Sequence, residues 1–126
     1  MKYYKTHLPE SEPVAQNLCF LYKSERIRLN PDEVIYIEAS VNYSKFVTCH
    51  QTLTTSFHLG FFAESLRQNP NFIRINKSHL INLNYLKSLD WQKDSKEACL
   101  TNGSRLPISR RKAKEFKEVL WKKVSG

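Results

Sequence analysis

The strongest concentration of side chains that could bind a ligand lies in Ser109–Lys114, which reads Ser-Arg-Arg-Lys-Ala-Lys. Ser109 is a good N-cap residue, so the cations that follow it fall in the first turn of a helix. The helix dipole opposes each cation there, at a cost of about 0.3–1 kcal/mol at low salt. Free backbone N–H groups and clustered guanidinium groups are instead suited to an external phosphate. The segment therefore predicts an anion-binding helix start at Ser109, Arg110, Arg111 and Lys114, with a solvated basic helix terminus as the alternative.

Two polar loops carry further hydrogen-bonding side chains. In Phe72–Asn82, apolar residues bracket a polar quartet that must turn outward between two strands: Asn76, Lys77, Ser78 and His79. Glu38–Lys45 is a second polar loop between two strands. These residue types hydrogen-bond phosphates and base edges. Either loop alone fits an ordinary connection, but the two loops together with the basic helix start favour a binding surface.

No arrangement of residues predicts catalysis. The four histidines form neither an HExxH motif nor a close pair at metal-ligand spacing. The sequence has no GxSxG motif, and its three glycines are too few for a glycine-rich phosphate loop. Cys19, Cys49 and Cys99 each lie in an apolar strand pattern, which predicts packing rather than reactivity. We expect no enzyme activity, no metal and no cofactor.

The charge of the chain points to a polyanionic partner. The 126 residues carry 20 Lys and Arg against 12 Asp and Glu, a net charge of +8, and the sequence pI is about 9.5. Arg105–Gly126 alone holds eight bases and two acids, a net charge of +6. No apolar run approaches the roughly 20 residues of a membrane-spanning helix, and the opening segment lacks the apolar stretch of a signal peptide. We expect a cytoplasmic protein with no membrane partner.

The elements that position these residues are mostly short strands. Strands are predicted at Leu18–Tyr22, Arg26–Leu29, Val34–Ser40, Lys45–Gln51, Leu53–Phe57, Phe72–Ile75, His79–Leu83 and Leu86–Trp91. Helical spacing of apolar residues predicts a small helix at Leu59–Leu66 and a C-terminal helix at Ala113–Val124. We expect a mainly β fold, with residues 1–17 as a loosely ordered leader and residues 18–124 as one domain.

Two details of strand geometry follow from the pattern. Alternation along Val34–Ser40 places three apolar residues on one face of the strand: Ile35, Ile37 and Ala39. Asn102-Gly103 predicts a hairpin with a two-residue type I′ turn. That register places Cys99 opposite Leu106.

Three blocks of the sequence resemble those of LytTR DNA-binding domains, in the same order and at similar spacing. They are Val34–Ala39 followed by Asn42-Tyr43, then Phe72–Asn82, then Asn102-Gly103 followed by Leu106–Arg111. The resemblance covers about Leu29 to Leu120. It implies an elongated arrangement of short antiparallel strands with one small helix and a C-terminal helix. In that family, loops enter successive major grooves of double-stranded DNA, typically over direct repeats.

The resemblance also implies which residues bind DNA. By position in the blocks, these are Asn42, Tyr43, Ser44, Lys45, Asn76, Lys77, Ser78, Ser109, Arg110 and Arg111. Asn76 stands where the family often has His, and Lys77 where it often has Arg. Because lysine lacks the guanidinium fork, a guanine contact at Lys77 would be less discriminating. Many relatives carry an N-terminal receiver domain, and only about 28 residues precede the resemblance here, so we expect a stand-alone domain or a fragment of a longer regulator.

We predict a sequence-specific transcriptional regulator that binds double-stranded DNA without catalysis. It could bind DNA as a dimer or as copies loaded side by side. A regulatory protein could also bind it. Two other classes stay open. An RNA-binding β module would stack single-stranded bases on exposed aromatic residues such as Tyr43 and Phe57. A protein-interaction domain would dock its basic helix on an acidic partner.

Overall fold

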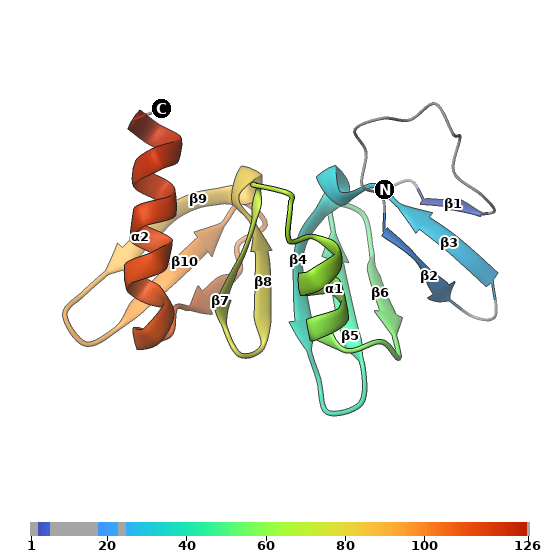
Figure 1. The fold of residues 1–126 in the computed structure, drawn as a ribbon. Helices are drawn as coiled ribbons and strands as arrows, with labels where there is room; N and C mark the ends of the chain where they lie inside the picture. Colours follow the sequence, from blue (N-terminus) through green and yellow to red (C-terminus); the bar gives the residue numbers. More distant parts are fainter. Residues whose placement is uncertain (1–2, 6–17, 23–24, 126) are drawn as a thin grey trace.

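Three antiparallel sheets and two helices form the fold (Figure 1), in a computed structural model that describes residues 3–5, 18–22 and 25–125. The central sheet has the strand order β6 (Thr52–Thr55), β5 (Ser44–Thr48), β4 (Val34–Ala39), β8 (His79–Asn82) and β7 (Phe72–Asn76). A second sheet, at one end of the molecule, consists of β1 (Tyr3–Lys5), β3 (Glu25–Leu29) and β2 (Leu18–Tyr22). The third sheet, at the other end, consists of β11 (Arg105–Pro107), β10 (Lys96–Leu100) and β9 (Leu86–Trp91).

The strands and the two helices together confirm the prediction of a mainly β fold with one small helix and one C-terminal helix. Helix α1 (Leu59–Ser65) packs against the central and second sheets, and α2 (Arg110–Ser125) packs against β7 and the third sheet. Short 3-10 turns precede β4 (η1, Pro31–Glu33) and follow β8 (η2, Leu83–Tyr85). In the described part of the chain, no helix is long and apolar enough to cross a membrane.

Two hydrophobic cores bury the central sheet on both faces. In the first core, Phe46 of β5 meets Phe62 of α1 edge-on, with 4.7 Å between ring centroids. In the second core, β7 and the third sheet pack against α2, whose Phe116 is fully buried. Neighbouring residues of β8 point to opposite faces, with Leu80 in the first core and Ile81 in the second. Packing on both faces therefore holds the three sheets and both helices together.

A β-bulge in β4 overturns the predicted alternation of that strand. The pairing of β4 with β5 shifts register between Val34 and Tyr36. As a result, Val34 and Ile37 both face the first core, whereas Ile35 faces the second. The prediction that Ile35 shares a face with Ile37 and Ala39 was wrong, because a bulge adds one residue and reverses the alternation beyond it.

The β10–β11 hairpin has a three-residue loop rather than the predicted two-residue turn. Cys99 pairs with Arg105, and Ala98 pairs with Leu106. The Gly103 N–H donates to the Leu100 carbonyl at 3.0 Å, and Gly103 has a φ of +92°. Gly103 thus supplies the left-handed residue that follows a type I turn in three-residue hairpins. The predicted pairing of Cys99 with Leu106 was wrong by one residue, and Ala98 is the residue buried there.

The cysteines are less buried than the sequence pattern suggested. Cys19 and Cys49 are exposed, and Cys99 is half-buried. Cys49 lies in the turn between β5 and β6 and not in a strand, because β5 ends at Thr48. The Thr48 hydroxyl donates to the Gln51 carbonyl at 2.7 Å and closes this turn. The prediction that these cysteines are packing residues was wrong for Cys19 and Cys49.

The N-terminal part of the chain is described only in short stretches. The hairpin predicted from Leu18–Tyr22 and Arg26–Leu29 is confirmed by the pairing of β2 with β3. Strand β1 adds to the other edge of β3. The remainder of the predicted leader, and the turn at residues 23–24, lie outside the described residues. The boundary between leader and domain stays a prediction.

Candidate functional site

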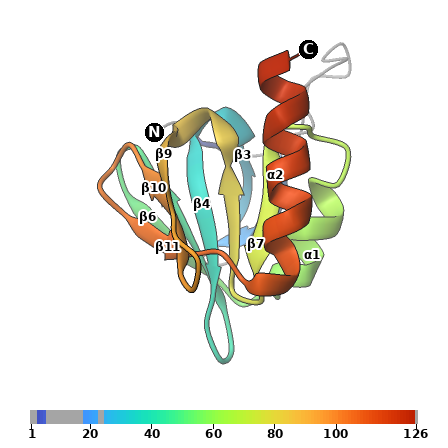
Figure 2. The same cartoon turned by 90° about the vertical axis from the view of Figure 1, so that its left-hand side faces the viewer.

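The sheet topology brings the three predicted binding segments to one edge of the molecule. Strands β4 and β7 both pair antiparallel with β8, so they run in the same direction. The β4–β5 and β7–β8 turns therefore form at the same end of the central sheet (Figure 1). The Ser109 N–H donates to the Ile75 carbonyl at 2.8 Å, which places the start of α2 beside the end of β7. Figure 2 shows the same three segments together at the lower edge. We call residues 40–45, 76–79 and 109–114 the loop edge.

The β7–β8 turn is held in place by Arg74, which lies on strand β7. The Arg74 guanidinium donates from Nη2 to the Lys77 carbonyl at 2.7 Å and from Nε to the Asn76 carbonyl at 3.3 Å. Within the turn, Asn76 Oδ1 accepts a hydrogen bond from the Ser78 N–H at 2.6 Å. These contacts use the backbone of the turn and the Asn76 amide, and they leave the Lys77 side chain exposed.

The first turn of α2 presents cations next to that turn. Ser109 acts as the predicted N-cap, since its Oγ accepts a hydrogen bond from the Lys112 N–H at 3.2 Å. The first turn contains no acidic residue, and Arg110, Arg111 and Lys114 are exposed. A surface pocket of about 660 Å³ lies between the two segments and is lined by Arg74, Asn76, Lys77, Ser109, Arg111 and Lys112. Four cations and two polar side chains thus converge on one hollow, which suits an anion.

The β4–β5 turn presents uncharged side chains. The Ser40 N–H donates to the Tyr43 carbonyl at 2.7 Å and closes the turn. At the tip, Val41, Asn42 and Tyr43 are exposed. Ser44 is fully buried, and its hydroxyl donates to the Phe57 carbonyl at 2.7 Å. The Ser44 hydroxyl therefore anchors the turn to the segment that precedes α1.

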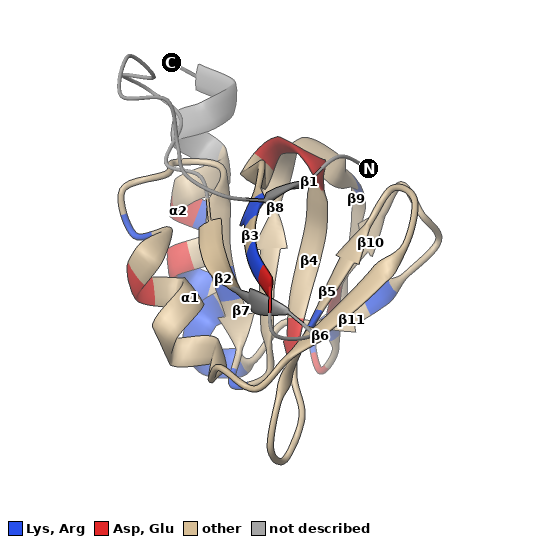
Figure 3. Cartoon of the chain, turned by 90° about the vertical axis from the view of Figure 1, so that its right-hand side faces the viewer, with Lys and Arg blue, Asp and Glu red and all other residues tan. Residues whose placement is uncertain are grey.

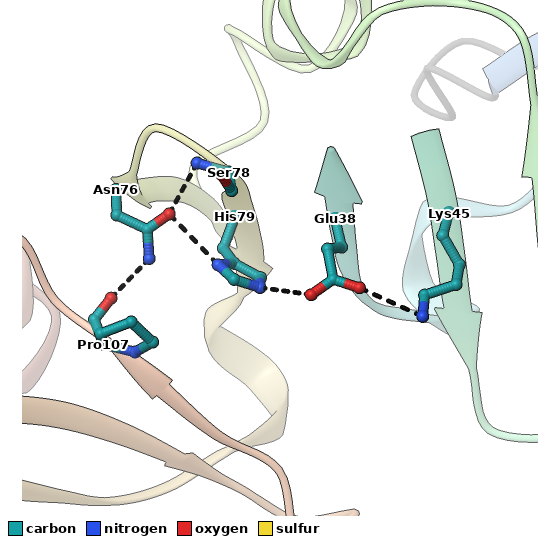
Figure 4. Close-up of polar contacts among 6 residues, drawn as sticks. All are labelled: Glu38, Lys45, Asn76, Ser78, His79 and Pro107. Carbon is teal, nitrogen blue, oxygen red and sulfur yellow. Dashed lines mark hydrogen bonds and ion pairs between the residues drawn. The ribbon is translucent and has the colours of Figure 1, made fainter. Parts of the chain in front are cut away.

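A chain of polar contacts connects residues of the loop edge across the central sheet (Figure 4). Glu38 pairs with Lys45 at 3.1 Å through one carboxylate oxygen and with His79 Nε2 at 2.9 Å through the other. His79 Nδ1 lies 3.1 Å from Asn76 Oδ1, and Asn76 Nδ2 donates to the Pro107 carbonyl at 2.6 Å. We call these residues, Lys45, Glu38, His79, Asn76 and Pro107, the Glu38 network.

The contact between Glu38 and Lys45 favours the ionised form of both side chains. Burial alone would raise the pKa of Glu38, but the hydrogen bonds from His79 and Lys45 bring it below its ordinary value of 4.5. The hydrogen bond to Glu38 in turn raises the pKa of Lys45 above 10.5. Glu38 and Lys45 therefore neutralise each other at neutral pH.

The predicted binding residues fall into two groups. Those with exposed side chains on the loop edge are Asn42, Tyr43, Lys77, Arg110, Arg111 and Lys114. Those that are buried or half-buried are Ser44, Lys45, Asn76, Ser78, His79 and Ser109. Within the second group, Ser44, Asn76 and His79 hydrogen-bond to other parts of the chain, which suits them to holding the loops in place.

The structure adds residues that were not among the predicted binding residues. Arg74 and Lys112 line the pocket, and Glu38 connects two of the loops. A signal for Arg74 was present, because it alternates with the buried Ile73 and Ile75 and so had to face away from the second core. The signal for Glu38 depended on knowing which strand lies beside β4.

Comparisons with known proteins agree with one another. The profile of the LytTr DNA-binding domain family matches residues 24–121. The sensory transduction protein LytT of Bacillus subtilis (strain 168) is 28% identical over 89 residues, covering 70% of this chain and 36% of LytT. LytT of Bacillus anthracis is 25% identical over 95 residues, covering 75% of this chain and 38% of LytT. A solved LytTr DNA-binding domain from Bacillus cereus superposes with a TM-score of 0.70 at 25% identity, over 82% of this chain and 95% of that domain. The chain thus spans a little over a third of the length of these curated relatives.

Proposed function

Because the chain belongs to the LytTR family of DNA-binding domains, we propose that it is a transcriptional regulator that binds specific sequences of double-stranded DNA with its loop edge. The observation that carries the proposal is the meeting of the β7–β8 turn and the start of α2 around one pocket lined by four cations. The uncharged β4–β5 turn lies at the same edge of the molecule.

The cationic pocket and the α2 start are suited to the phosphate backbone. Arg110 and Arg111 follow the N-cap of α2, where backbone N–H groups and the helix dipole also favour an anion. Lys77 projects from the neighbouring turn, and with Ser78 it fixes the register of the domain on DNA. Figure 3 shows Lys and Arg gathered where α2 begins, next to β7. Arginine side chains in this position can also reach guanine in the major groove.

The tip of the β4–β5 turn is suited to base edges in the adjacent groove. Residues 40–44 carry no charge, and Figure 3 shows no Lys or Arg at the tip of this hairpin. Lys45, which follows the tip, is neutralised by Glu38. An uncharged turn is only weakly attracted to phosphates, so its specific contacts come from the bases themselves. Copies of the domain loaded side by side on direct repeats would each present the same two contact regions.

One alternative loses part of its support in the structure. An RNA-binding surface was expected to expose both Tyr43 and Phe57. Tyr43 is 41% exposed, but Phe57 is half-buried and stacks on Phe61 with 4.9 Å between ring centroids. Phe57 is therefore engaged within the protein, and a stacking platform of two free rings is not available there.

Selection of bound duplexes from a random pool, followed by binding measurements against salt, tests the proposal. We expect one enriched motif, and affinity for it that falls roughly 10³-fold between about 50 and about 200 mM salt if about six phosphates are neutralised. Arg111→Ala should weaken binding by about 1–3 kcal/mol and relax the preference at one base pair if Arg111 reads a base edge. Lys87→Ala, which removes an exposed cation of β9 away from the loop edge, is the matched control and should change little.

Three outcomes would contradict the proposal. Retention of single-stranded RNA in preference to duplex DNA would favour an RNA-binding module. No retention of duplex DNA even at low salt would favour an acidic protein partner. Equal affinity for every duplex would mean that the domain contacts only the backbone.

A further inference from the structure

We propose that Glu38 is a positioning residue: its carboxylate holds the β4–β5 turn, the β7–β8 turn and the strand leading into α2 in one arrangement, and so favours specific over non-specific DNA binding. This inference rests on the proposed function. It concerns a side chain that is half-buried and placed behind the DNA-contacting residues, not among them.

The pairing of the central strands puts Glu38 where it can join the loops. Glu38 is paired across the ladder with Lys45 on β5 and with His79 on β8. Directly opposite residues share a face of the sheet, so the three side chains lie in one row. The row continues from His79 through Asn76 to the Pro107 carbonyl at the end of β11. Pro107 lies two residues before the N-cap Ser109, so the row extends from the β4–β5 turn to the start of α2.

The hydrogen-bonding capacities of two groups fix the orientation of the Asn76 amide. The Pro107 carbonyl can only accept and the Ser78 N–H can only donate, so the Asn76 amide has one orientation that satisfies both. Asn76 Oδ1 then faces His79 Nδ1 at 3.1 Å, and His79 Nε2 faces the Glu38 carboxylate at 2.9 Å. A network of this kind favours one geometry for the groups that it joins.

A carboxylate at the position of Glu38 does not help the domain to bind DNA of arbitrary sequence. A unit negative charge about 10 Å from a phosphate is repelled by about 0.4 kcal/mol in water, which is about twofold in affinity. Glu38 also restrains Lys45, which would otherwise be free to reach any phosphate. Both effects weaken binding to arbitrary DNA, whereas a fixed loop geometry strengthens binding to a matching sequence. Glu38 therefore weakens non-specific binding and strengthens binding to a matching sequence.

Glu38→Gln tests this sign difference on two probes, the duplex that the wild-type chain selects and a random-sequence duplex of equal length. The variant should bind the selected duplex about tenfold more weakly, the equivalent of one charge-assisted hydrogen bond (~1.4 kcal/mol). It should bind the random duplex about twofold more tightly. Glu64→Gln is the matched control, because Glu64 lies on α1, is 71% exposed and pairs with Arg67 at 3.3 Å. It should leave both affinities unchanged.

Glu38→Asp separates position from charge. The aspartate keeps the negative charge but is shorter by one methylene, so it cannot span from Lys45 to His79. We expect it to lose affinity for the selected duplex without gaining affinity for the random one. Amide spectra of each variant establish folding, and the Asp variant decides the question if the Gln variant does not fold. Equal strengthening of both duplexes by Glu38→Gln, or wild-type behaviour of Glu38→Asp, would overturn the proposal. A wild-type chain that selects no duplex would instead mark failure of the proposed function.

A second inference, which also rests on the proposed function, is drawn from the exposure of Val41. This side chain is 88% exposed, the largest value among the big hydrophobic residues that the structure describes. It lies at the tip of a turn that the bond from the Ser40 N–H to the Tyr43 carbonyl closes at 2.7 Å. Valine is also stiff about χ1, so its two methyl groups have defined positions. In the major groove the matching apolar group is the 5-methyl of thymine, and we infer that Val41 contacts a thymine methyl.

Deoxyuridine, which differs from thymidine by that methyl alone, provides the test. Each thymine of the selected duplex is replaced in turn, and wild type and Val41→Ala are compared. One replacement should weaken wild-type binding by about fourfold, the value of one buried methyl group. Val41→Ala should bind the original duplex more weakly and not respond to that replacement. The inference is overturned if wild type responds to none of the replacements, or if Val41→Ala keeps the same loss at the same position.

Discussion

A substitution of Asn76 best distinguishes a residue that binds DNA from one that holds the loops in position. Its position in the sequence suggested a DNA contact, but its amide makes three contacts inside the protein. Nδ2 donates to the Pro107 carbonyl at 2.6 Å, and Oδ1 accepts from the Ser78 N–H at 2.6 Å and lies 3.1 Å from His79 Nδ1. Asn76→Ala removes all three contacts and leaves the backbone of the turn in place.

The expected loss of stability follows from those contacts. Each neutral hydrogen bond contributes about 1 kcal/mol net, and Asn76 is half-buried, so water replaces part of what the variant loses. We therefore expect the free energy of unfolding to fall by about 2 kcal/mol. For a domain of this size the melting temperature changes by about 4 °C for each kcal/mol, so Asn76→Ala should melt about 8 °C lower.

Urea unfolding of the free protein measures this loss without any DNA. The midpoint should move to lower urea while the m-value stays the same, because the folded and unfolded states keep their exposed areas. Lys77→Ala is the matched control from the same turn, since the Lys77 side chain is exposed. It should leave the unfolding midpoint unchanged and weaken DNA binding. Asn76→Ala should weaken both.

One result would refute the positioning role of Asn76. A variant that unfolds at the same urea concentration as wild type, yet binds the selected duplex more weakly, would show that the amide is free to reach DNA. The bond to Pro107 would then be dispensable for the arrangement of β7–β8 and β11.

Three further predictions concern the cores and the ionisable groups. Phe116→Ala should lower the free energy of unfolding by about 3–5 kcal/mol, because Phe116 is fully buried between α2 and the third sheet, and urea unfolding measures it. The lowered pKa of Glu38 means that its stabilising effect is present above pH 4.5 and is lost as the pH falls through the folded-state value, so the stability difference between wild type and Glu38→Gln should shrink in acid. Burial, the contact with Cys49 and nearby acids raise the pKa of Tyr85 from 10.0 to about 12. Its stabilising effect is therefore present below pH 10.0 and is lost as the pH rises towards about 12, and urea midpoints of Tyr85→Phe should lack this alkaline loss.

The local elements of the fold could be predicted because their signals are local. Alternating apolar residues and turn residues identified the strands of the central sheet, and helical spacing identified α1 and α2. Ser109 was recognised as an N-cap from its own type and the residues that follow it. Gly103 was identified as a turn residue, but the length of its loop was wrong, since the same glycine also serves a three-residue loop.

The internal contacts of the loop residues could not be predicted because they join residues far apart along the chain. Asn76 was predicted to bind DNA, and its amide also hydrogen-bonds the Pro107 carbonyl, 31 residues away. His79 was predicted in the same way, and it also pairs with Glu38, 41 residues away. Polar residues in a loop can bind a ligand or other parts of the protein. The contacts within the protein depend on the strand order, which short-range patterns do not contain, and the DNA contacts of these two residues stay predictions.

The most direct test of the central claim is to map amide chemical shifts of the full chain as the selected duplex is added. Binding by the loop edge predicts that the largest changes fall on residues 40–45, 76–79 and 109–114, with little change in β2, β3 and α1. Largest changes on α1 and the second sheet, with the three loops unaffected, would contradict it.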